Sequence, residues 1–100
     1  MSLAVYSYRF EPEVPIVEVE GSLLLAIMGV ESLHGESQTR LDAGHYMDVE
    51  KRAVVIDAAT KVGQDLNRLF VGFLRREFGP DAFTVERLNG PVTSSTPAAA

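Results

Sequence analysis

The chain has 100 residues, of which 46% are hydrophobic and 23% are charged, a balance that excludes a wholly disordered chain and a membrane protein. Its formal net charge of −5 leads us to expect no nucleic-acid or membrane partner, because binding to phosphate groups relies on lysine and arginine. Without cysteine there is no disulfide, thiolate metal ligand or thiol nucleophile, so the fold rests on packing alone and we expect a cytoplasmic protein.

The length suits one α+β domain, which we expect to span residues 1–90. Residues 91–100 are uncharged and rich in serine, threonine, proline and alanine. Such a segment cannot bury enough apolar surface to order itself, so we predict a disordered tail there.

The N-terminal part of the chain predicts two strands. Leu3–Phe10 alternates along its length and puts Tyr6, Tyr8 and Phe10 on one face. After a break that contains proline, Val14–Glu20 alternates in the same way. We therefore expect a second strand there, and a hairpin between the two.

A helix is predicted next, over Leu23–Leu33, with Ser22 as its N-cap and the following His-Gly pair as its end. The alternative is that Leu23–Ile27 prolongs the preceding strand. If the segment is helical, its first two turns are apolar almost all round, and they include Leu25 and Met28. Such a helix needs a second partner besides its own sheet.

The second half predicts an antiparallel pair of strands followed by a long helix. Gln38–Met47 and Arg52–Asp57 form the pair, joined by a polar connection of hairpin length. The helix follows its N-cap Thr60 and ends at Gly79-Pro80. Its apolar and polar residues fall in opposite sectors, so one face is buried and one is wet. A last strand is expected over Ala82–Leu88.

From Val14 to Leu88 the expected order is β-α-β-β-α-β, which is the ferredoxin-like arrangement. This is a two-layer α+β sandwich, with both helices on one face of a four-stranded antiparallel sheet. Leu3–Phe10 is then an extra N-terminal strand. Because this arrangement hosts many unrelated functions, it predicts no activity.

Asp57, Thr60 and His45 are the candidate ligand-binding residues. Asp57 ends a buried strand and Thr60 starts a helix, and polar groups at such a place gather around cavities. Turn and cap hydrogen bonds are the alternative role. Gly63, near the apolar side of the same helix, allows either close packing or the approach of a ligand to the backbone.

Glu31 and His34 have the spacing that puts a carboxylate and an imidazole on one helix face, as some metal sites require. Only one copy exists and the other histidine lies in a predicted strand, so we expect no metal site. No phosphate-binding or nucleophile motif is present, so we predict no catalytic residue and no cofactor. Arg68, Arg75 and Arg76 share the wet helix face, where they either bind an anion or are simply solvated.

The segment VVIDAATKVGQDLNRLF resembles the strand-turn-helix of STAS-like regulatory domains, in which an apolar strand ending in aspartate leads to a helix start with a polar switch residue. The resemblance covers under a fifth of the chain. Thr60 stands where a serine would be expected, and the predicted hairpin at Asp48–Lys51 departs from that fold.

Two surfaces lack a partner in the expected arrangement. They are the aromatic strand face, with Tyr6, Tyr8 and Phe10, and the first helix, with Leu25 and Met28. We predict that these residues form the interface of a two-fold homodimer. Stacking of bases on the aromatic face is the alternative, which the acidic charge disfavours.

The function predicted from the sequence is a small non-enzymatic module for interaction or regulation that self-associates and possesses surfaces for a protein partner. The alternative is a small-ligand-binding or weakly catalytic domain, with its pocket near Asp57, Thr60 and His45. Absence of catalytic motifs favours the first of these.

Overall fold

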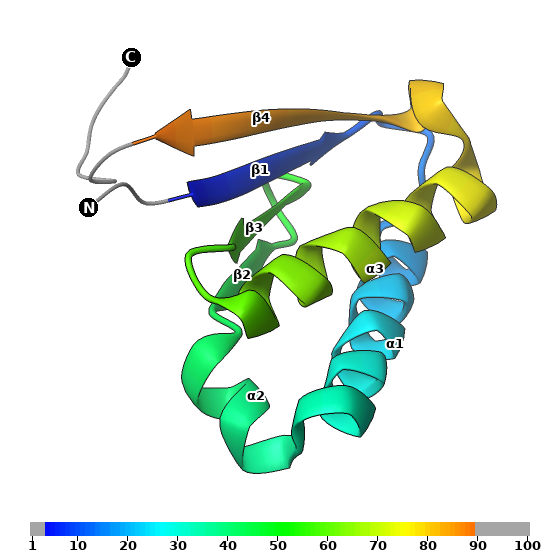
Figure 1. Cartoon of the computed structure of the whole chain (residues 1–100). Helices are drawn as coiled ribbons and strands as arrows, with labels where there is room; N and C mark the ends of the chain where they lie inside the picture. Colours follow the sequence, from blue (N-terminus) through cyan, green and yellow to red (C-terminus); the bar gives the residue numbers. More distant parts are fainter. Residues whose placement is uncertain (1–3, 90–100) are drawn as a thin grey trace.

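Residues 4–89, which the computed structural model describes, form a four-stranded antiparallel sheet with three α-helices (Figure 1). The elements in chain order are β1 (Ala4–Phe10), α1 (Ile16–His34), α2 (Glu36–Asp42), β2 (His45–Asp48), β3 (Ala53–Asp57), α3 (Lys61–Phe78), the short 3₁₀ helix η1 (Pro80–Ala82) and β4 (Phe83–Asn89). The strand order is β2-β3-β1-β4, with every neighbouring pair antiparallel. The α+β class is as predicted, and the tail predicted over residues 91–100 lies outside the described residues.

The core lies between one face of the sheet and the helices α1 and α3 (Figure 1). Tyr8, in the central strand β1, pairs with Val54 of β3 and Val85 of β4. Its side chain is fully buried, and its ring meets the ring of Phe70 edge-on, with 4.9 Å between the centroids. The central strand is therefore fixed to α3 by an aromatic contact.

The expectation that the aromatic strand face is uncovered is wrong. Tyr8 and Phe10 are 0% and 6% exposed, and Phe10 packs near Phe83 of β4 with 6.1 Å between the ring centroids. The reason is topological, because the strand predicted as an extra element is the middle of the sheet and lies beneath the helices. Tyr8 and Phe10 belong to the core, whereas Tyr6 keeps partial exposure.

The strand predicted over Val14–Glu20 is also wrong, since this segment enters α1. Pro15 precedes the helix with φ −69°, and Ser22, predicted as the N-cap, is buried inside it. A short alternation of valine and glutamate is compatible with either structure, and the longer helical spacing of apolar residues decides. The buried residues with that spacing are Val19, Leu23, Ala26 and Val30.

The strand predicted over Gln38–Met47 is wrong except at its C-terminal end. Its first residues form α2, and β2 begins only at His45. On α2 the Arg40 side chain pairs with Glu36, and Gln38 donates to the carboxylate of Asp42. Both pairs have the i,i+4 spacing that brings side chains together on a helix, which the strand interpretation overlooked.

The predicted C-terminal elements are confirmed. The side chain of Thr60 accepts a hydrogen bond from the Gly63 N–H (2.9 Å), so it caps α3 as expected. Gly79 ends the helix at φ 88°, and its N–H bonds to the Arg75 carbonyl (3.1 Å). None of the helices in the described part of the chain has the length and apolar character to cross a membrane.

Candidate functional site

The three predicted ligand-binding residues lie close to one another, where β3 leads into α3 and α2 leads into β2. The Asp57 carboxylate accepts from the Ala59 N–H (2.9 Å), and the Thr60 hydroxyl donates to the Asp42 carbonyl (2.6 Å). The Nδ1–H of His45 donates to the carbonyl of Ala43 (2.9 Å). Each polar group thus makes a turn or cap hydrogen bond within the chain, as in the alternative role considered from the sequence.

Gly63 explains how closely α3 approaches the end of β3. A Cβ atom built at this position would lie 2.1 Å from the carbonyl oxygen of Asp57, far inside van der Waals contact. A glycine is therefore required for packing, because no other residue fits without moving the helix or the strand end. This close approach accounts for Gly63 without a ligand.

His34 pairs with the helix beside it rather than with Glu31. Its Nε2 lies 2.8 Å from the Asp65 carboxylate, whose other oxygen lies 3.0 Å from the Lys61 ammonium. The hydrogen bond to His34, and then that to Lys61, lowers the pKa of Asp65 below its usual value of 3.8. Within residues 4–89 no three metal-ligating side chains come together.

The outer face of α1 is apolar. We define this face by Val17, Leu24, Leu25 and Met28, which are 73, 55, 58 and 60% exposed. Helical spacing places them opposite the buried stripe of the same helix, and Gly21 lies among them with open space above its Cα. Of the predicted interface residues, Leu25 and Met28 therefore lie on an exposed apolar surface.

The edges of the α1 outer face are acidic. Glu18 and Glu20 are exposed near its N-terminal end, Glu31 is partly exposed near its C-terminal end, and α1 contains no lysine or arginine. A surface of this kind combines a hydrophobic centre with a polar rim, which is the common anatomy of protein interfaces.

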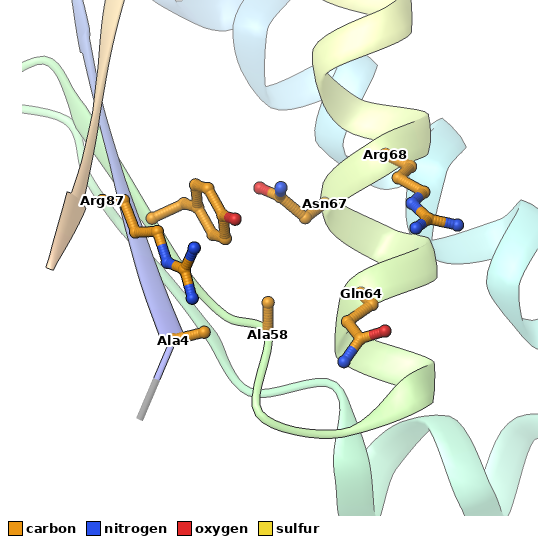
Figure 2. A pocket seen from close by; sticks show the side chains of 7 residues that line it. Ala4, Ala58, Gln64, Asn67, Arg68 and Arg87 are labelled. Carbon is orange, nitrogen blue, oxygen red and sulfur yellow. The ribbon is translucent and has the colours of Figure 1, made fainter. Parts of the chain in front are cut away.

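A pocket of about 190 Å³ opens between the β1–β4 edge of the sheet and α3 (Figure 2). Its lining residues, none of which is acidic, are Ala4, Tyr6, Ala58, Gln64, Asn67, Arg68 and Arg87. This pocket was not predicted from the sequence. The signal was the alternation of β4, which puts the charged Arg87 on the core side of the sheet beside Phe83 and Val85.

Asn67 links the pocket to the core. The hydroxyl of the buried Tyr8 donates to its side-chain oxygen. Burial is the main cause that raises the pKa of Tyr8 far above its usual value, with a smaller contribution from Tyr6. Tyr8 is therefore protonated at neutral pH and donates this hydrogen bond.

No protein-family model matches this chain, and comparison with curated proteins finds no significant match. A functional proposal therefore depends on the surfaces and contacts described above.

Proposed function

We propose that this domain is a non-enzymatic, cytoplasmic interaction module that self-associates as a two-fold dimer through the α1 outer face. The observation that supports this proposal is the exposure of four large apolar side chains along one helix stripe: Val17, Leu24, Leu25 and Met28. A helix that is apolar on both faces needs a partner on both faces, and the domain's own sheet and α3 cover only one of them.

A second copy of the chain suits this surface because a two-fold axis pairs one patch with itself. A standard interface buries about 800 Å² on each partner, and its centre is formed by a few large apolar side chains. Gly21 has no side chain and open space above it, so it lets the backbones of two α1 helices approach closely. Glu18 and Glu20 then stay at the solvated rim.

We also propose that the fold is a ferredoxin-like sandwich to which α2 is added. Without α2, the described elements follow the order β-α-β-β-α-β, and the strand order is β2-β3-β1-β4. This version has no extra N-terminal strand, because β1 is the first strand of the repeat. The arrangement carries no functional conclusion of its own.

Sedimentation equilibrium over a range of micromolar concentrations tests self-association. We expect the wild type to be a dimer and Met28→Glu to be a monomer, because the variant places a carboxylate in the centre of the interface. Leu41→Glu is the matched control, since Leu41 is 80% exposed but lies on α2, outside the stripe. The proposal fails if the wild type stays monomeric, or if Met28→Glu dimerises as the wild type does.

A further inference from the structure

The charged and amide side chains that line the pocket between the sheet and α3 are two arginines and two neutral amides, and none of the lining residues is acidic. Arg87 comes from β4, and Arg68, Gln64 and Asn67 come from α3. Among residues 4–89 neither arginine forms an ion pair with a carboxylate. In a chain that has 14 acidic and 9 basic residues, a pocket lined by two arginines and no acid is a local reversal of charge.

Arg87 and Asn67 point into the same space from opposite sides (Figure 2). Arg87 extends from β4, Asn67 extends from α3, and Ala58 lies between these elements, below both side chains in the view. The guanidinium of Arg68 lies on the far side of α3 and points away from Arg87. Arg87 and Asn67 are therefore the groups placed to contact a ligand, and Arg68 adds positive charge at the rim.

Both groups are held in place by the tyrosines of β1. The Tyr6 ring lies 5.9 Å from the Arg87 guanidinium carbon, within the range of a cation–π contact. The Tyr8 hydroxyl donates a hydrogen bond to the side-chain oxygen of Asn67, so the amide N–H groups are the part of that side chain available to a ligand. Within the described residues those N–H groups have no protein partner. The groups that Arg87 and Asn67 offer to a ligand are therefore hydrogen-bond donors.

The size of the pocket limits the ligand. A dry cavity of about 150 Å³ is known to hold benzene, so the ≈ 190 Å³ here accommodates a six-membered ring with one small substituent. Tyr6, Ala4 and Ala58 supply apolar surface for the ring. Arginine pairs with a carboxylate through two parallel hydrogen bonds, which suits an anionic substituent.

We propose that this pocket binds a small organic carboxylate, up to about the size of benzoate, whose carboxylate pairs with Arg87 and accepts a hydrogen bond from Asn67. No residue of α1 lines the pocket, so binding there is independent of self-association through the α1 outer face. The two proposals can therefore fail separately.

Titration of the ¹⁵N-labelled protein with sodium benzoate at constant ionic strength tests the site. We expect saturable shifts, with a Kd of order 1 mM, at the amides of Ala58, Asn67 and Arg87. Benzyl alcohol has the same ring without the charge, and we expect it to bind about tenfold more weakly. Equal binding of the two compounds, or shifts spread over the whole surface, would overturn the proposal.

Matched variants assign the binding to Arg87. Arg87→Gln is expected to weaken benzoate binding about tenfold, whereas Arg9→Gln removes the same charge from the opposite face of the sheet and is expected to change it less than about twofold. Tyr8→Phe keeps the core ring but releases Asn67, and we expect binding about threefold weaker. The site is refuted if Arg87→Gln and Arg9→Gln bind benzoate equally well. The ¹⁵N spectrum of each variant shows whether it is folded.

Discussion

α1 and α3 pack against each other and against the same face of the sheet, yet they present different surfaces to solvent (Figure 1). The exposed residues of α3 are polar and include Gln64, Arg68, Arg75 and Arg76. The exposed residues along the α1 stripe are Val17, Leu24, Leu25 and Met28. Packing of one domain explains both faces of α3, but it explains only one face of α1.

This difference between the solvent-facing surfaces of α1 and α3 indicates which surface of the domain has a function. A charged helix face is well solvated in water and needs no partner. A long apolar face on a helix whose other side is already buried adds nothing to the stability of the isolated domain. It does contribute once another surface covers it, which is why the proposed interface is on α1.

The largest effect is expected from placing a charge on the buried face of α3. Leu66→Asp buries an unpaired carboxylate at a position that is fully buried, and we expect a loss of about 4 kcal/mol or more in the free energy of unfolding. Leu24→Asp on the α1 outer face is the counterpart, and it is expected to leave the fold intact. Thermal melts followed by circular dichroism measure both. Similar melting of Leu66→Asp and the wild type would refute the assignment of the two faces.

The glycines of the two helices sharpen the same contrast. Gly63→Ala in α3 forces a Cβ against the Asp57 carbonyl, and we expect a loss of about 1–3 kcal/mol. Gly21→Ala in α1 meets open space within one protomer, so at concentrations where the protein is monomeric alanine's higher helix propensity is expected to add up to about 1 kcal/mol. Urea titrations give both values. Equal effects of the two substitutions would show that the close approach at Gly63 does not constrain the fold.

The same helices differ in how well the sequence predicted them. α3 was predicted because its signals are local: Thr60 provides a side-chain cap, Gly79 a left-handed stop, and opposite polar and apolar sectors lie between them. α1 lacks a side-chain cap and has no polar face, so Val14–Glu20 resembled a strand as much as a helix. Local periodicity does not report which face a second element will cover.

The pocket was harder to predict from the sequence than either helix. The predicted residues Asp57 and Thr60 lie near the pocket, since Ala58 between them lines it. Their own polar groups, however, form turn and cap hydrogen bonds. Arg87 and Asn67 come from separate elements, and their meeting depends on how β4 and α3 flank β1. The spacing of residues within one segment does not predict that these two side chains come together. The one sequence signal was Arg87, a charged residue on the core side of β4.

The acidic edges of α1 predict how the proposed dimer responds to salt. Two copies of a helix that contains Glu18, Glu20 and Glu31 but no lysine or arginine repel each other at the rim. Raising sodium chloride from about 0.02 to 0.3 M screens this repulsion, so we expect the dimer to tighten severalfold. Sedimentation equilibrium at each salt concentration measures the change. A dimer that weakens with salt would instead indicate an interface joined by opposite charges, and the α1 outer face would be the wrong surface.

The smallest effect concerns the contact that joins the two helices, the pair of His34 on α1 with Asp65 on α3. The pKa of Asp65 is lowered in the folded protein, so its ionised form stabilises the fold at pH values above the usual carboxyl range, and this contribution is lost as the pH falls through that range. Asp65→Asn is therefore expected to lose about 1 kcal/mol at pH 7, and the difference from the wild type is expected to shrink as the pH falls below the usual carboxyl range and to vanish below the lowered pKa of Asp65. Glu77→Gln removes an equal charge from an exposed site on α3 and serves as the control. Denaturant titrations at several pH values measure the free energy of unfolding of each variant. If the loss caused by Asp65→Asn persists in acid, or if Glu77→Gln causes the same loss, the His34–Asp65 contact does not stabilise the packing of α1 on α3.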